Sequence, residues 1–242
     1  MVAPEIHKEF ILFMRKRFKL VIILFMVSTQ NYLGQNVVKH YTKDSISFYL
    51  NQNKNPENKS IPINYSEAIQ IALLHYPELN KTKIKFRLRK KLAPLAARPR
   101  IFSIFLKPTK RKYLITISYS TIQMLKPILL EKLSFNAQIG VLGHELSHIS
   151  EFNSKTGFFF VELALKQLFS KRAIDRFEYA TDMRCIEHGL GYQLLGWSTE
   201  VRQKLRLGKW GGANNPKAKR ERYMNPETII SVMKAFPLYT LN

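Results

Sequence analysis

Apolar residues recur at helical spacing in one part of the chain and at every second position in another. Residues 65–76 have the helical spacing, with Asn64 as the expected N-cap and Pro77 as the stop. From Lys83 to Arg89, apolar residues alternate with Lys and Arg. This alternation predicts a half-buried strand whose outer face is cationic.

Two later apolar runs, at 101–106 and 113–118, predict two more strands joined by a basic turn around 108–110. The strands so far would form a small antiparallel sheet. The cationic face at 83–89 is either solvated or in contact with an anionic partner, and the pattern leaves both open. Stacking of single-stranded nucleic acid on this strand is disfavoured because Phe86 lies on the face opposite the cations.

Beyond Thr121 the pattern is helical throughout. Ser134 is the expected N-cap of the longest helix, and Gly189 is the expected end of a later one. The Phe158–Phe160 run fits the core better than a wedge that dips into a membrane. The fold class is therefore α+β, mainly helical, with the small sheet preceding the longest helix. The predicted helices are 127–133, 135–152, 158–169, 171–188, 199–207 and 226–236, with a glycine-rich loop at 208–212.

The amino terminus has the three-part pattern of an export signal. Residues 14–19 are basic, residues 20–27 are an unbroken apolar run and polar residues follow. The apolar run is about half the ~20 residues that span a bilayer. We expect 1–35 to be a signal peptide or N-terminal anchor, 36–63 a linker and 64–242 the functional domain. Cleavage near Gly34, an uncleaved anchor and a buried first helix all remain open, but export to the periplasm or beyond the cell is favoured.

Composition narrows the class of protein. The 45% hydrophobic content excludes a disordered chain, and the single cysteine, Cys185, excludes a disulfide framework and a Cys-rich zinc module. The chain has 39 Lys and Arg against 17 Asp and Glu, a formal charge of +22. Such an excess favours an anionic partner, either lipid or an envelope polymer. Export disfavours nucleic acid as a partner, and nothing in the pattern indicates an oligomeric state.

The chemistry concentrates in the predicted helix 135–152, which contains His144-Glu145-Leu146-Ser147-His148. Spacing by four places both imidazoles on one helix face, where two nitrogens can bind one metal ion. Glu145 lies beside them and can hold and deprotonate a water molecule. These three residues are the candidate metal site and general base.

A catalytic zinc site needs a third protein ligand and an open position. Glu178 is the candidate, and Asp182 lies one helical turn later on the same face. Asp182 could accept a hydrogen bond from an imidazole and fix its tautomer. His188 is the alternative third ligand.

The motif His144-Glu145-x-x-His148 followed by Glu178-x-x-x-Asp182 resembles the gluzincin metallopeptidases, especially the HtpX-like and CAAX-protease-like peptidases. The resemblance covers about 114–189. It implies a zincin-like domain at 64–242 and a zinc-dependent endopeptidase that acts on proteins or peptides. It further implies one Zn²⁺ held by the two histidines and Glu178, with Glu145 as general base. Asp182 would support a ligating histidine by a hydrogen bond.

In one position the chain departs from these families, which usually have Ala directly before the Asp, where this chain has Thr181. Attack of a metal-activated water on a peptide carbonyl also requires a hydrogen-bond donor for the oxyanion that forms. The candidates are His188, Arg184, Arg222 and Tyr223. The strand 113–118 is expected to be the exposed edge to which a peptide substrate adds.

Two other functions remain open at this stage. One is an envelope binding protein that keeps the zinc site but hydrolyses little. The other is a cytoplasmic SprT-like protease that acts on DNA-bound proteins, for which the charge of +22 is the argument.

Overall fold

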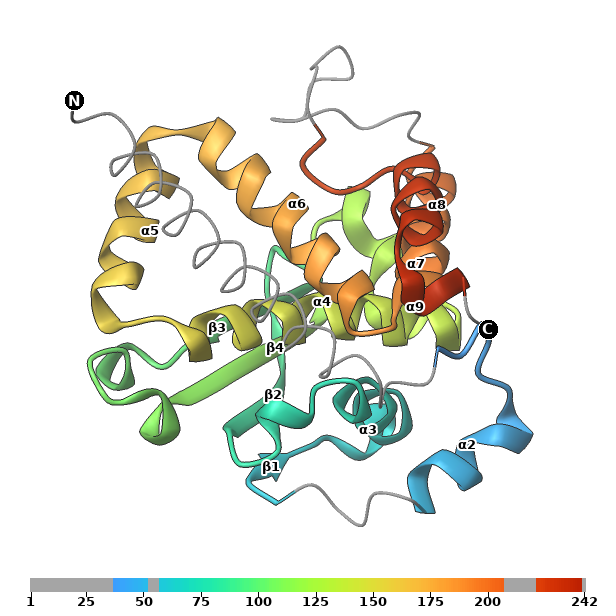
Figure 1. Ribbon diagram of the computed structural model, residues 1–242, viewed down its shortest axis with the longest axis horizontal. Helices are drawn as coiled ribbons and strands as arrows, with labels where there is room; N and C mark the ends of the chain where they lie inside the picture. The colour runs from blue at the N-terminus through green and yellow to red at the C-terminus, as the bar shows by residue number, and fades with distance from the viewer. Residues whose placement is uncertain (1–36, 52–56, 207–220, 241–242) are drawn as a thin grey trace, which may run out of the picture. The chain divides into compact units, whose positions relative to one another are not determined.

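The computed structural model describes residues 37–51, 57–206 and 221–240 (Figure 1). The predicted signal segment 1–35 and the glycine-rich loop 208–212 lie outside these ranges. The strands are β1 (Lys59–Ser60), β2 (Lys83–Lys90), β3 (Leu95–Pro99) and β4 (Lys112–Ser120). The helices are α2 (Lys43–Asn51), α3 (Ser66–Leu74), α4 (Phe135–Ser154), α5 (Gly157–Phe169), α6 (Lys171–Glu187), α7 (Gly191–Lys204), α8 (Pro226–Ala235) and α9 (Pro237–Thr240). This mixture agrees with the α+β class.

The four strands form one mixed sheet in the order β1-β2-β4-β3. β1 and β4 both run parallel to β2, and only β3 is antiparallel to its neighbour β4. The predicted antiparallel sheet was therefore wrong. Sequence order suggested that neighbours along the chain pair with one another, but β4 lies between β2 and β3.

The predicted strand 101–106 was also wrong. It contains a 3-10 turn, Ile101–Ser103, in which Ser103 Oγ donates to the carbonyl oxygens of Arg100 (2.8 Å) and Lys112 (3.1 Å). Its place in the sheet is taken by β3, which the prediction missed because prolines stand at 94 and 99. Proline is tolerated there because β3 is an edge strand.

One face of the sheet forms part of the core. Ile84 and Phe86 of β2 pair with Tyr113 and Ile115 of β4, and all four are buried. The opposite face of β2 carries Lys and Arg, as the alternation predicted. α4 contacts α3, α6, α7 and β3, so most of the body is built around this helix (Figure 1).

α4 is positioned by its cap and by a close helix crossing. Ser134 caps the helix as predicted, with Oγ accepting from the backbone N–H of Ala137. A Cβ atom at Gly140 would lie 2.2 Å from the carbonyl oxygen of Gln193 in α7. Glycine at 140 therefore allows the backbones of α4 and α7 to approach closely.

Other helix boundaries differ from the prediction. The helix expected at 65–76 is α3, preceded by a 3-10 turn, so Asn64 is not its cap. The helix expected at 127–133 is two 3-10 turns, Gln123–Ile128 and Leu130–Lys132. The one expected at 199–207 is the second half of α7. α6 ends before Gly189 (φ +81°) as predicted.

Part of the segment expected to be a linker is folded onto the body. Residues 36–63 include α2 and β1, and Tyr41 is buried. The backbone N–H of Tyr41 donates to Asn136 Oδ1 in α4 (2.9 Å). None of the helices in the described ranges is both long and apolar enough to span a membrane.

Candidate metal centre

Two adjacent turns of α4 present His144, Glu145 and His148. All three side chains are buried. The imidazole rings of His144 and His148 are perpendicular, with centroids 4.8 Å apart. Trp197 lies 5.4 Å from the His144 ring and Phe177 lies 5.1 Å from the His148 ring, centroid to centroid. The α-helical spacing and these aromatic neighbours fix both imidazoles on one face.

α6 brings Glu178 to the same point. Its Oε2 atom lies 3.2 Å from Nε2 of His144 and 3.3 Å from Nε2 of His148. Ligands at the usual 2.0–2.1 Å from a tetrahedral zinc ion would stand about 3.3–3.4 Å from one another. In the described part of the chain, these three residues are the cluster whose ligand atoms all lie within 4.8 Å of one another.

Glu178 Oε2 is an orphaned polar atom. It is buried and makes no hydrogen bond to any described residue, although both imidazoles are near. A buried carboxylate oxygen without a partner is costly. Its position between two imidazole nitrogens is the position of a metal ligand, so the donor set fits a divalent cation.

The electrostatics of the cluster also favour a cation. Burial alone would raise the pKa of Glu178, but the two imidazoles outweigh it and hold this pKa well below its usual range. Burial alone would lower the pKa of His144, but the carboxylates of Asp182 and Glu178 outweigh it and raise this pKa well above 6.5. The site therefore stabilises positive charge in its centre.

Each imidazole has a partner that fixes its tautomer. His144 Nδ1 donates to Asp182 Oδ1 (2.8 Å). Thr181 Oγ1 donates to the carbonyl oxygen of Phe177 (2.9 Å) and so accepts from His148 Nδ1 (3.2 Å). In the neutral form of each imidazole the proton is on Nδ1, so both Nε2 lone pairs face Glu178 and are available for a metal ion.

Asp182 joins the centre to the segment 221–225. Its second oxygen, Oδ2, accepts from the backbone N–H of Met224 (2.7 Å). The buried guanidinium of Arg202 holds the same segment, donating to the carbonyl oxygens of Tyr223 and Met224 and to Asn225 Oδ1. The segment that carries Tyr223 is thus fixed from two sides.

Glu145 is held at the edge of the sheet. Its Oε2 atom accepts from the backbone N–H of Ala97 in β3 (2.5 Å). Burial raises the pKa of Glu145 above its usual range, which is the direction that favours a general base. Since Ala97 directs its N–H away from β4, the free edge of β3 faces the centre.

The expectation that strand 113–118 is an exposed edge was therefore wrong. It lies within β4, which is paired on both sides by β2 and β3. The exposed edge beside the centre belongs to β3.

Of the four candidate oxyanion donors, only Tyr223 is brought to the centre. Its ring lies 5.6 Å from that of His144, and burial raises its pKa well above 10, so the hydroxyl keeps its proton. Arg222 donates to Asp175 (2.7 Å), and Arg184 donates to Glu151. His188, also the alternative third ligand, stacks on Tyr76 and contacts Glu78, so it is absent from the ligand cluster.

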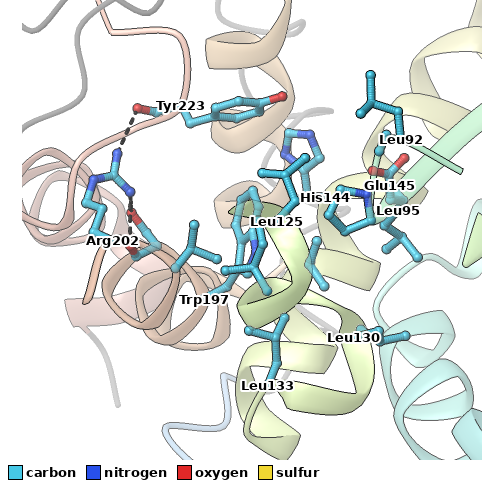
Figure 2. A pocket seen from close by; sticks show the side chains of 16 residues that line it. Leu92, Leu95, Leu125, Leu130, Leu133, His144, Glu145, Trp197, Arg202 and Tyr223 are labelled. Carbon is cyan, nitrogen blue, oxygen red and sulfur yellow. Dashed lines mark hydrogen bonds between the residues drawn. The ribbon is translucent and has the colours of Figure 1, made fainter. Parts of the chain in front are cut away.

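A cavity of about 460 Å³ opens beside His144 and Glu145 (Figure 2). Tyr223 and Trp197 stand next to the imidazole, and Leu95 of β3 is on the side of Glu145. The remaining walls are almost entirely apolar, formed by Leu92, Ala93, Pro94, Leu125, Ile128, Leu130, Leu133, Val141 and Val201, with Ser198 and Arg202 as the polar exceptions.

Sequence reasoning missed several residues at this site. Thr181 had a signal, because it lies three residues after Glu178 and so on the same side of α6. Ala97, Trp197 and Arg202 had none, because they act through a backbone N–H, a ring face and a structural hydrogen-bond network.

Comparison of the chain with models of known families, with curated proteins and with solved structures found no significant match.

Proposed function

We propose that this protein is a zinc-dependent metalloendopeptidase of gluzincin type, acting on protein substrates at the cell envelope. The observation that carries the proposal is the orphaned Oε2 of Glu178 at 3.2 and 3.3 Å from two imidazole nitrogens. Two neutral imidazoles and one carboxylate are a ligand set of catalytic zinc, in which a fourth position remains for water or substrate.

The chain's residues divide the chemistry between them. A bound zinc ion would act as the Lewis acid that polarises the substrate carbonyl and lowers the pKa of the water bound to it. Glu145 accepts the proton of the attacking water at its carboxylate and delivers it to the leaving nitrogen. Its raised pKa suits both transfers. The protonated hydroxyl of Tyr223 is the donor to the developing oxyanion.

Substrate binding follows from β3 and the cavity. The free edge of β3 offers backbone hydrogen bonds to an extended peptide beside Ala97, whose own N–H is held by Glu145. The apolar cavity then receives one side chain of that peptide, and Leu, Phe and other large apolar side chains suit its walls. Burying such a side chain rather than Ala contributes about 1.5–3 kcal/mol, which is roughly a 10- to 150-fold preference in kcat/KM.

The decisive experiment compares Glu145→Gln with Glu151→Gln. Both residues lie on α4, but Glu151 pairs with Lys155 and Arg184 away from the ligands. We expect purified wild-type protein to contain one zinc ion per chain and to cleave unfolded protein substrates. Glu145→Gln should keep the metal and lose cleavage by about 10²-fold or more, whereas Glu151→Gln should keep both.

Two outcomes would refute the proposal. If the wild-type protein binds no divalent metal, the proposed centre does not exist. If metal is bound but Glu145→Gln leaves cleavage unchanged, or no cleavage is found for any unfolded substrate, the centre is a binding site without hydrolysis.

A further inference from the structure

The loop between β3 and β4 has its polarity reversed. Ile101, Phe102 and Phe105 are 67%, 96% and 75% exposed, whereas Ser103 and Arg111 are almost completely buried. A soluble surface loop ordinarily has the opposite arrangement, with polar side chains outward. We call residues 101–106 the apolar loop.

Polar anchors hold the apolar loop in this arrangement. Arg111 donates from Nε to the carbonyl oxygen of Leu106 (2.9 Å) and from Nη1 to that of Phe152 at the end of α4 (2.8 Å). The Ser103 hydroxyl bonds the carbonyl oxygens of Arg100 and Lys112. The backbone is thus tied to the body, and the outward direction of the apolar side chains is built into the fold.

The start of α5 continues this apolar surface. A Cβ atom at Gly157 would lie 3.0 Å from the carbonyl oxygen of Ile104, so the helix begins directly against the apolar loop (Figure 1). Phe158, Val161 and Leu165 are all exposed and share one helix face at i, i+3 and i+7. Only Phe160 of the Phe158–Phe160 run is in the core, so the expectation of a buried run holds for that residue and is wrong for Phe158.

Positive charge surrounds the same surface. Between Glu78 and Glu131 the sequence has fourteen Lys and Arg and no Asp or Glu. Five of these cations directly flank the apolar loop and are exposed, and none of the five has an ion pair with a described residue. They are Arg98, Arg100, Lys107, Lys110 and Lys112.

We propose that the apolar loop, the exposed face of α5 and these cations form a surface that binds an anionic lipid bilayer. Apolar side chains enter the boundary between headgroups and acyl chains, while Lys and Arg remain among the anionic headgroups. Nucleic acid fits less well, because Ile101, Val161 and Leu165 have no ring to stack on bases. None of the residues of this surface belongs to the ligand cluster or lines the cavity, and the inference does not depend on the proposed peptidase activity.

The first test measures binding of the full chain to vesicles. We expect wild-type protein to sediment with phosphatidylcholine vesicles that contain about 30% phosphatidylglycerol, more weakly as salt rises, and poorly with pure phosphatidylcholine. The double variant Phe102→Ser, Phe105→Ser should bind the anionic vesicles about tenfold more weakly or worse. Ile63→Ser is the matched control, since Ile63 is 85% exposed and outside the proposed surface, and it should bind like wild type.

The second test measures insertion directly. Tryptophan introduced by Phe102→Trp should be quenched by brominated phosphatidylcholine in anionic vesicles, and tryptophan introduced by Ile63→Trp should not. Peptidase activity on soluble peptides should be unchanged in all of these variants, because none of the substituted residues touches the centre.

Unchanged vesicle binding by the double variant overturns the proposal, because binding would then come from another part of the chain. Equal quenching of the two introduced tryptophans also overturns it. Salt-sensitive binding to duplex DNA without binding to anionic vesicles overturns it in favour of a nucleic-acid surface.

Discussion

Asp182→Asn is an almost isosteric change that tests how the centre is prepared for a metal ion. Asp182 is 1% exposed, and both of its oxygens are acceptors. Oδ1 accepts from His144 Nδ1 at 2.8 Å, and Oδ2 accepts from the backbone N–H of Met224 at 2.7 Å. Asparagine has only one acceptor oxygen and replaces the other with an NH₂ donor.

The effect on His144 follows from this loss of one acceptor. The backbone N–H of Met224 can only donate, so the remaining oxygen of Asn stays with it and the NH₂ group faces His144 Nδ1. This arrangement favours the tautomer with its proton on Nε2, the atom that lies 3.2 Å from Glu178 Oε2. Loss of such a supporting partner typically lowers metal affinity by about 10- to 100-fold, which is about 1.4–2.7 kcal/mol.

The assay is competition for zinc between the protein and a chromophoric chelator. Nitrogen chemical shifts of the His144 imidazole would report the tautomer independently. Asp175→Asn is the control, because Asp175 is also a buried acid on α6 but pairs with Arg222. We expect Asp175→Asn to lower stability and to leave zinc affinity within about twofold of wild type.

Equal zinc affinity in Asp182→Asn and wild type would refute the reasoning about the tautomer. An equal loss in Asp175→Asn and Asp182→Asn would show that the effect is one of general stability.

Three further predictions concern stability and metal content. Burial lowers the pKa of His75 to about 4, so between pH 6.5 and 4 the unfolded chain binds a proton at His75 that the folded chain does not. Through His75, the free energy of unfolding in EDTA should therefore fall by about 3 kcal/mol from pH 6.5 to 4. Urea titrations of His75→Gln should lack this part of the pH dependence. The same pH dependence of unfolding in His75→Gln and wild type would contradict this prediction. Gly140→Val should destabilise the fold by about 3 kcal/mol in thermal melts, because its Cβ would meet the carbonyl of Gln193; wild-type stability would refute the close crossing. Glu178→Ala should lose most bound zinc by elemental analysis and Glu187→Ala on the same helix should not, whereas full zinc retention in Glu178→Ala would exclude Glu178 as a ligand.

The parts of the site that could be predicted are those set by helical spacing. The positions of His144, Glu145 and His148 on α4, and of Glu178 and Asp182 on α6, depend only on residues three or four apart. Ser134 and Gly189 marked helix ends for equally local reasons. From such spacing the sequence could indicate that two helices each present a reactive face.

The parts that could not be predicted depend on contacts between distant segments. The insertion of β4 between β2 and β3 is a property of the whole sheet, and it decides which edge faces Glu145. The apolar run 101–106 has the composition of a strand, but its Ser103 and Arg111 hydrogen bonds turn it outward. Short apolar runs cannot be assigned from periodicity alone.

The hydrogen bond from Met224 to Asp182 has a consequence for synthesis of the chain. The ribosome releases Glu145 and Glu178 well before Tyr223, and the carboxylate that orients His144 acquires its second donor only when residue 224 has emerged. A nascent or prematurely terminated polypeptide would therefore lack both the oxyanion donor and part of the support of the first imidazole. The proposed centre would thus become complete only when the last part of the chain has been made.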